Sequence, residues 1–379
     1  MKITKVEAVP VDKFLFAKVY TDEGIIGYGE SGAWGFLEPS ASAIDKFGEY
    51  LVGQDPLLIE HHWQYMYRFS HFRGAAIMGA ISALDIALWD IAGKNFGVPV
   101  YQLLGGKTRD KARVYYHVFG STRDQLVNGI KLAKQQGFTA VGHLTPFLDE
   151  ERDLPYFKTH ASKIRDGIEA VAMYRDAVGD EVDLCIEIHR RLSPAEAVVL
   201  ARGIEEFHPF FYEDPILPDN FDAMGLVAQG ISVPIATGER LHSIHEFQML
   251  LNRGAVQYVR PDVCLAGGIT HTKKIAALAE ANYVGVVPHN PLGPISTAAC
   301  LQIAAAIPNF SIQEYPLGEL EPPKSEIVNR PLELDKGFLK IPEEPGIGIE
   351  IVDGAAEKFP AVARPVNTRL HLDGSVFDQ

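Results

Sequence analysis

Six polar residues recur at nearly constant intervals along the second half of the chain. Each closes a strand-like run, and successive members stand 23 to 27 residues apart: Glu187, Glu213, Glu239, Asp262, His289 and Glu314. About 25 residues accommodate one strand, one helix and two short loops. We therefore expect these six side chains at equivalent positions on six successive strands. The same period, extended towards the N-terminus, places His117 and His143 near the ends of two earlier strands.

Strand-like and helical patterns alternate over the same region. Eight strand-like runs begin with ARVYYHV at residues 112–118 and end with SIQEY at residues 311–315, and helical periodicity fills most connections between them. The connection after the second run is longer, and residues 146–156 within it look like an inserted loop. This alternation favours a (β/α) barrel over an open sheet. The carboxyl ends of barrel strands meet on one face, where the chemistry of such proteins takes place.

The first 110 residues follow a different order. A hairpin pattern at residues 2–20 leads through a turn at 21–24 into a third strand, and helical patterns follow at 40–51, 59–69 and 75–95. Strands followed by helices predict an α+β domain ahead of the barrel.

Composition limits the partners that the chain can have. Its 379 residues carry 35 lysines and arginines against 49 aspartates and glutamates, a formal net charge of −14. Such a chain repels nucleic acid and anionic membranes, so we expect neither as a partner. No apolar run approaches the roughly 18 residues of a membrane span. The three cysteines show no CxxC spacing, which indicates reduced thiols in a cytoplasmic protein.

The first three of the six recurring residues are all glutamates: Glu187, Glu213 and Glu239. Carboxylates held together in a partly buried site repel one another strongly, and a hard divalent cation removes that repulsion. Oxygen ligands suit Mg²⁺, with Mn²⁺ as a substitute, and disfavour zinc. The alternative is that all three are ordinary surface glutamates at loop starts. Their equal spacing favours the metal site.

Asp262 and His289 fall on neighbouring predicted strands. A carboxylate beside an imidazole fixes its tautomer and stabilises the imidazolium, so His289 is predicted to be a general base rather than a structural histidine. His189 stands two residues after Glu187, a spacing that places both side chains on the same side of a strand. We expect His189 to act as a general acid, with a ligand or hydrogen-bonding role as the alternatives.

Glu314 and two arginines complete the predicted site. Because three glutamates already serve the metal, Glu314 is free to stabilise a developing oxyanion as a protonated or hydrogen-bonding carboxyl group, or else it is structural. Arg260 and Arg240 stand within two residues of the recurring set. Each would either contact substrate oxygens or form a salt bridge with the acids.

Several motifs together resemble the enolase superfamily, in its mandelate racemase subgroup. The C-terminal region carries EIH, YEDP, TGER, RPDVCLAGGIT, PHNPLG and QEY, and the N-terminal region carries DEGIIGYGE and ALDIALWDIAGK. The resemblance implies an α/β fold with a (β/α)7β barrel over residues 111–319. An N-terminal α+β capping domain over residues 1–110 would be completed by residues 320–379. The family reaction is abstraction of the proton α to a carboxylate, with Mg²⁺ stabilising the enediolate, and relatives associate as homo-oligomers.

Residue by residue, the resemblance assigns Glu187, Glu213 and Glu239 to the metal, Asp262 and His289 to the base, and Glu314 to the substrate carboxylate. Residues 142–144 read Gly-His-Leu, where many members carry a Lys-x-Lys motif. A lysine/histidine racemase is therefore disfavoured. With His189 after the first ligand, the chain is most similar to galactonate and mannonate dehydratases, which have aspartate where Glu187 stands. The implied activity is that of a hydro-lyase, which dehydrates galactonate, gluconate or mannonate to a 2-keto-3-deoxy sugar acid.

Alternatives stay open for individual residues and for the reaction. Trp34 in a capping-domain loop, His117 and Arg260 are predicted to contact the substrate, although packing or structural roles are equally compatible with the sequence. Tyr156 is an alternative general acid, as a tyrosine is in mannonate dehydratases. An acid-sugar epimerase, racemase or cycloisomerase would use the same enediolate, and a non-catalytic family member is the remaining alternative.

Overall fold

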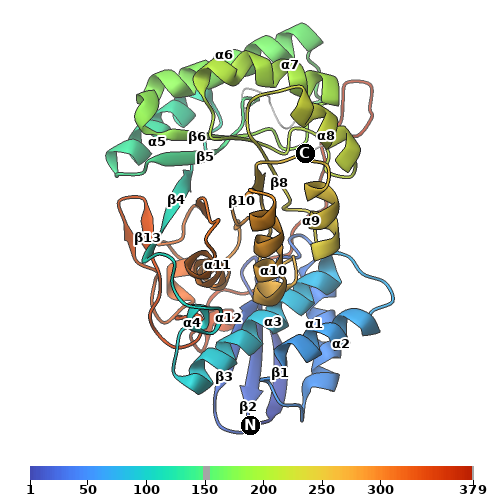
Figure 1. Cartoon of the computed structure of the whole chain (residues 1–379), viewed down its shortest axis with the longest axis vertical. Helices are drawn as coiled ribbons and strands as arrows, with labels where there is room; N and C mark the ends of the chain where they lie inside the picture. Colours follow the sequence, from blue (N-terminus) through green and yellow to red (C-terminus); the bar gives the residue numbers. More distant parts are fainter. Residues whose placement is uncertain (148–153, 378–379) are drawn as a thin grey trace.

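The N-terminal region is an antiparallel sheet covered by helices. The computed structural model describes residues 1–147 and 154–377. Strands β1 (Ile3–Val11), β2 (Phe14–Thr21) and β3 (Ile26–Glu30) pair in that order. Helices α1 (Leu37–Leu51), α2 (Ile59–Phe69) and α3 (Ala75–Phe96) follow, and together they form the blue unit at the lower end of Figure 1. We call residues 1–110 the cap.

Eight parallel strands make up the barrel within the described residues. They are β4 (Lys111–His117), β5 (Ala140–Leu144), β6 (Asp183–Glu187), β7 (Phe211–Glu213), β8 (Ile235–Thr237), β9 (Tyr258–Val259), β10 (Gly285–Val286) and β11 (Gln313–Tyr315). Successive strands from β4 to β10 pair in parallel. Strand β11 pairs with β4, and a parallel bridge joins Val286 to Phe310, so the sheet closes on itself.

Seven described helices connect these strands. They are α5 (Arg123–Gln135), α6 (His160–Val178), α7 (Pro194–Ile204), α8 (Phe221–Gln229), α9 (Ile244–Leu251), α10 (Gly268–Ala281) and α11 (Pro294–Ala306). One helix stands between each strand and the next. The predicted α/β fold, a (β/α)7β barrel with an N-terminal α+β domain, is therefore confirmed.

Local sequence explains where several barrel helices begin. Thr122, Asn220 and Ser243 each accept a backbone N–H of the following helix, and Ser193 forms a capping box with Glu196. Inside the barrel, buried side chains fill the axis: Tyr115, Ala140, Cys185, Phe211, Ala236, Val287 and Ile312. Because this interior is packed, polar functional groups have room only at the carboxyl ends of the strands.

Helix α3 links the cap to the barrel. It is long and apolar enough to cross a membrane by length and composition, but 78% of the relevant window is buried inside the protein, as in a core helix. It ends at Gly97, which adopts the left-handed conformation with φ of 68°. Asp85 accepts the backbone N–H of Thr270 in α10 at 3.0 Å. Trp63 of α2 donates to the Gly267 carbonyl at 2.9 Å.

Residues 320–377 divide their contacts between the two regions. Strands β12 (Leu334–Asp335) and β13 (Phe338–Lys340) form a hairpin, and β13 pairs antiparallel with barrel strand β4. Helix α12 (Ala355–Lys358) lies against β1 of the cap. Farther on, the backbone of Tyr156 pairs with residues 370 and 372. Parts of this segment thus contact the barrel and parts contact the cap, and the expected completion of the cap by residues 320–379 stays a prediction.

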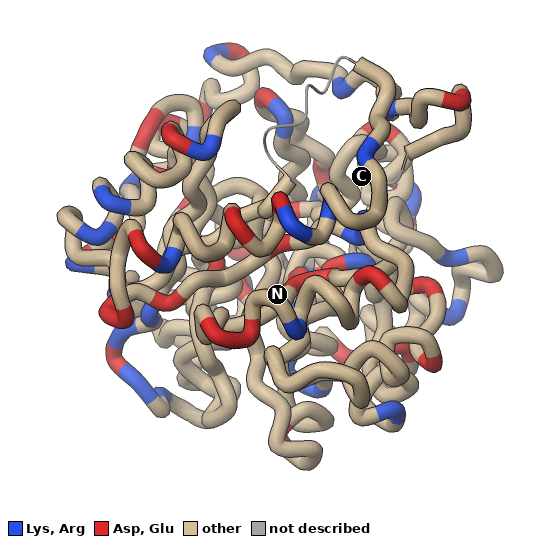
Figure 2. Tube along the Cα trace, turned by 90° about the horizontal axis from the view of Figure 1, so that it is seen from above, with Lys and Arg blue, Asp and Glu red and all other residues tan. Residues whose placement is uncertain are grey.

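Charged residues of both signs are interspersed along the surface elements. Figure 2 shows lysine and arginine positions among the more numerous aspartate and glutamate positions rather than gathered on one element. The electrostatics of the site therefore follow from its own residues.

Candidate active site

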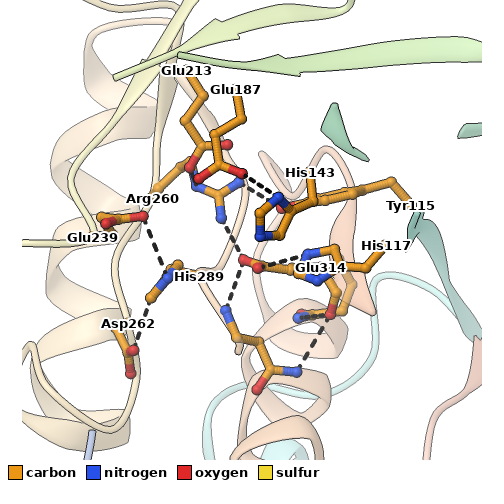
Figure 3. Close-up of polar contacts among 12 residues, drawn as sticks. Tyr115, His117, His143, Glu187, Glu213, Glu239, Arg260, Asp262, His289 and Glu314 are labelled. Carbon is orange, nitrogen blue, oxygen red and sulfur yellow. Dashed lines mark hydrogen bonds and ion pairs between the residues drawn. The ribbon is translucent and has the colours of Figure 1, made fainter. Parts of the chain in front are cut away.

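The recurring residues come together at the carboxyl ends of the barrel strands, but not at one depth. Glu187 and Glu213 are the last residues of β6 and β7 and lie opposite each other in the strand register. Glu239 follows the end of β8 by two residues, whereas Glu314 lies within β11. Asp262 and His289 follow β9 and β10 and form a parallel bridge of their own. Figure 3 shows all six side chains converging.

The three glutamates offer a set of ligand oxygens. One carboxylate oxygen from each of Glu187, Glu213 and Glu239 lies within 4.8 Å of the other two. Burial, together with the two neighbouring glutamates, raises the pKa of Glu213 well above its usual range, although Arg260 opposes the effect. An oxygen-only set with this crowding of charge fits a hard divalent cation such as Mg²⁺.

Arg260 is the buried hub of this site. Its side chain comes from the end of β9 and is 1% exposed. Its three guanidinium nitrogens contact Glu213 at 2.8 Å, the Tyr115 hydroxyl at 2.6 Å and Glu314. The salt-bridge alternative for Arg260 is thus present in the structure, and its contact with the substrate stays a prediction.

Glu314 is surrounded by donors. Besides Arg260, it accepts hydrogen bonds from the His117 Nε2 at 2.9 Å and from the Asn290 backbone N–H at 2.8 Å. Burial opposes ionisation, but Arg260, His289 and His117 together hold the pKa of Glu314 well below its usual range. Of the two forms expected for Glu314, this lowering of the pKa favours the ionised, hydrogen-bonded carboxylate. His117 is buried, and its imidazole contacts the Glu314 carboxylate.

Asp262 and His289 form the expected pair. The His289 Nδ1 lies 2.9 Å from Asp262 Oδ2, and its Nε2 faces Glu239 Oε2 at 3.4 Å. Burial lowers the pKa of His289, but Glu239, Glu314 and Asp262 outweigh it and raise the value to about 9. A carboxylate on Nδ1 leaves Nε2 as the nitrogen that can exchange a proton at the centre of the site.

His189 lies beside the three-glutamate cluster, on a turn after β6 rather than on the strand itself. Strand β6 ends at Glu187, and His189 has a left-handed backbone with φ of 60°. Its Nε2 lies 3.4 Å from Glu187 Oε1 and 3.1 Å from Arg190 Nη2. Burial lowers the pKa of His189 to about 4. His189 thus lies beside Glu187 as predicted, but a left-handed turn rather than strand alternation brings it there.

Arg190 and Asp214 were missed by the sequence reasoning. Arg190 Nη1 lies 2.5 Å from Glu239 Oε1 and 3.1 Å from Asp214 Oδ2, and both side chains are buried. Arg240, which was considered instead, is exposed. The available signal was that each missed residue adjoins a predicted one, Arg190 after EIH and Asp214 within YEDP.

Backbone strain gathers at these loops. His143, His189, Arg190 and Asp214 are non-glycine residues with φ between 39° and 68°. Each such residue costs about 1–3 kcal/mol, and strain of this kind clusters at functional sites. In this conformation, the Nδ1 of His143 lies 3.2 Å from Glu187 Oε2.

Trp34 and Tyr156 have other partners. Trp34 is 55% exposed, and the Arg364 guanidinium lies 3.1 Å from its ring centroid. The Tyr156 ring is buried against His371 and Phe377 of the C-terminal segment. The general-acid role of His189, and the alternative of Tyr156, stay predictions. Residues 148–153 of the expected loop lie outside the described residues.

Two family descriptions match the chain. "Mandelate racemase / muconate lactonizing enzyme, N-terminal domain" covers residues 3–105, and "Enolase C-terminal domain-like" covers residues 130–355. The chain belongs to this enolase-superfamily family. Its predicted membership in the mandelate racemase subgroup is confirmed.

Full-length relatives agree with this membership. The chain is 38% identical to D-galactonate dehydratase of Verminephrobacter eiseniae and 36% identical to that of Variovorax paradoxus, over 99% of each chain. Among solved structures, an enolase from Agrobacterium radiobacter with bound sodium and L-malate superposes with a TM-score of 0.91 at 31% identity, covering 100% of both chains. The predicted reaction class, a hydro-lyase, is confirmed by the dehydratase relatives.

Proposed function

We propose that this family member is a Mg²⁺-dependent dehydratase of a six-carbon aldonate, with D-galactonate as the first substrate to test. The observation that carries the proposal is the Asp262–His289 pair facing a cluster of three carboxylates. A general base beside a cation site suits removal of a proton next to a carboxylate. The full-length similarity to D-galactonate dehydratases supports this substrate class.

The donor set supports a divalent ion at the three glutamates. Among the described residues around this cluster, acids outnumber arginines. The acids are Glu187, Glu213, Asp214, Glu239, Asp262 and Glu314, and the arginines are Arg190 and Arg260. Glu187, Glu213 and Glu239 would hold the ion. When bound, Mg²⁺ would offset the negative charge that develops on the substrate carboxylate as the adjacent proton leaves.

The protein's own groups then divide the proton transfers. A cation bound to Glu239 would offset the carboxylate charge that raises the pKa of His289. Nε2 of His289 in its neutral form would then accept the proton from C2, and the carboxylate of Asp262 would stabilise the resulting imidazolium. His189 would protonate the departing C3 hydroxyl. The C3–O bond breaks, water leaves, and the enol that forms tautomerises to a 2-keto-3-deoxy acid. Glu314 would bind the substrate from strand β11. Arg260 and His117 offset the charge of its carboxylate.

A substrate screen tests this function. We expect purified protein with Mg²⁺ to yield a 2-keto acid, detected with semicarbazide, from one or two stereoisomers in a library of hexonates, pentonates and hexarates. NMR in D₂O would follow exchange at C2 for each negative compound. Exchange without a keto acid would indicate an epimerase. Two histidines could then exchange the C2 proton, since His189 and His289 contact the three-glutamate cluster from different strand ends. Silence in both assays would contradict the proposal.

Mg²⁺ should also stabilise the folded protein. At a concentration 100 times Kd, a ligand that binds only the folded state adds about 2.7 kcal/mol to the free energy of unfolding. We expect differential scanning fluorimetry to show a Tm several degrees higher in Mg²⁺ than in EDTA. Glu213→Gln should remove most of this difference, whereas Glu357→Gln, at an exposed position, should keep it. An equal Tm in both buffers would argue against the cation site.

Assembly and location remain part of the proposal. We expect a homo-oligomer in the cytoplasm, and light scattering during size-exclusion chromatography would measure the mass of the assembly.

A further inference from the structure

A carboxylate of the cap holds the start of a barrel helix. Glu30, the last residue of β3, is fully buried. Its Oε1 accepts the Gly293 backbone N–H at 2.7 Å, and its Oε2 accepts the Ser296 backbone N–H at 2.9 Å. These donors belong to the first turn of α11. Among the described residues, no side chain at the N-cap position of α11 bonds to this turn, so Glu30 caps the helix from another part of the chain.

The local sequence is shaped around this contact. Pro294 occupies the first turn of α11, where its missing N–H costs nothing. A Cβ at position 293 would lie 2.8 Å from Glu30 Oε1, so any other residue there would displace the carboxylate from its present position. Burial raises the pKa of Glu30 to about 8, and the two backbone donors and Lys324 oppose the effect.

The helix that Glu30 holds begins at Pro294, five residues after His289. Asn290 joins the two, because its Nδ2 donates to Thr297 Oγ1 of α11 at 2.9 Å. The backbone N–H of Asn290 donates to Glu314 Oε2 at 2.8 Å. The position of the first turn of α11 therefore sets the loop that carries His289 and one hydrogen bond to Glu314.

The same cap segment contacts the other half of the pair. Gly32 donates its backbone N–H to the Cys264 carbonyl at 2.7 Å. The Cys264 N–H in turn donates to Asp262 Oδ1 at 2.8 Å. Residues 30–32 of the cap thus touch both barrel loops that carry Asp262 and His289.

We propose that Glu30 is a positioning residue for the base, through which docking of the cap aligns His289 with Asp262 and the substrate. The inference rests on the proposed function, in which His289 removes the C2 proton. Misplacement of a reacting group by about 1 Å costs about 10²-fold in rate. Loss of the Glu30 contacts should therefore lower kcat more than it weakens metal or substrate binding.

Asp90 provides a matched control. It is likewise a fully buried cap carboxylate that accepts two backbone N–H groups, from Tyr28 at 3.0 Å and from Ile347 at 2.9 Å. These backbone partners lie in β3 and the C-terminal segment, and Lys94 of α3 forms an ion pair with Asp90 at 3.0 Å. Asp90→Asn therefore reproduces the loss of a buried carboxylate that makes no hydrogen bond to the first turn of α11.

The test compares Glu30→Gln, Glu30→Asp and Asp90→Asn as Mg²⁺-loaded full-length proteins. We expect Glu30→Gln to lower kcat by about 10²-fold, with the Mg²⁺-induced Tm shift kept and KM changed less than kcat. Glu30→Asp, which keeps a carboxyl group at this position, should recover part of kcat even if Glu30→Gln folds poorly. Asp90→Asn should lose Tm but keep kcat. Parallel losses of kcat and Tm in Glu30→Gln and Asp90→Asn would overturn the proposal.

Histidine NMR separates this inference from the proposed function. If the wild-type protein turns over no acid sugar, the proposed function fails, and the imidazole signals still report on alignment. With ring-labelled histidine and the His289 signal assigned from His289→Asn, we expect Glu30→Gln to shift that signal and Asp90→Asn to leave it in place. An unmoved His289 signal in Glu30→Gln would refute the positioning role.

Discussion

Replacing His289 with asparagine should abolish exchange of the C2 proton while leaving the metal site intact. A general base contributes about 10²–10⁴-fold to the rate, so we expect kcat to fall by about 10³-fold or more. The three glutamates keep their positions because they stand on β6, β7 and the loop after β8. Solvent deuterium incorporation at C2, followed by NMR, measures the step directly.

Two controls make the His289 result specific. The Mg²⁺-dependent rise in Tm should persist in His289→Asn, because His289 is not among the three clustered ligands. His160→Asn, at an exposed position in the first turn of α6, should exchange at the wild-type rate. C2 exchange that survives in His289→Asn would exclude the Asp262–His289 pair as the base.

Arg260→Met should cause the largest loss of stability. Arg260 contacts Glu213 and Glu314, and its side chain is almost completely inaccessible. Removing one partner of a buried ion pair leaves an uncompensated charge and costs about 3–5 kcal/mol. Urea unfolding of the metal-free protein in EDTA would measure this loss, and activity should disappear with the alignment of Glu213 and Glu314.

An exposed arginine provides the contrast. Arg253 pairs with Asp222 on the surface, and pairs of that kind contribute only about 0–1 kcal/mol. Arg253→Met should therefore leave the free energy of unfolding nearly unchanged. Equal losses in Arg253→Met and Arg260→Met would show that the buried hub does not stabilise the fold.

The cost of Arg260→Met should depend on pH. Arg260 is the strongest of the neighbours that hold the pKa of Glu314 below its usual range, against the effect of burial. A carboxyl group with a depressed folded-state pKa adds stability above its unfolded-state pKa, and loses it as the pH falls through the folded-state value. The difference between wild type and Arg260→Met should thus be full near neutral pH and shrink below about pH 4.

Sequence spacing predicted the barrel well because each strand–helix unit has a nearly constant length. The period predicted all six residues at equivalent strand ends; in the structure Glu187, Glu213 and Glu314 lie on strands, and Glu239, Asp262 and His289 lie just beyond them. It also located the pairing of Asp262 with His289, because neighbouring strands in a barrel are neighbours in space. A pattern repeated along the chain carries this information without any knowledge of packing.

The charge partners across the barrel did not follow from spacing. Arg260 reaches from β9 to Glu213 on β7 and Glu314 on β11, and Arg190 reaches from the β6 loop to Glu239. Such contacts depend on strand register, depth and left-handed loop residues such as His189 and Arg190. The same packing explains why Arg260 is a hub and why Tyr156 lies under the C-terminal segment.

By itself, the sequence determined the order of strands and helices, the polar residue that ends each repeat, and the motifs of the family. The tertiary structure alone decided which cations neutralise which acids, and which cap residue holds the loop of His289. The physical reason is that the repeat is encoded locally in hydrophobic periodicity. An ion pair such as Arg260–Glu314, or a cap such as Glu30 on α11, forms between distant segments only once the barrel has closed.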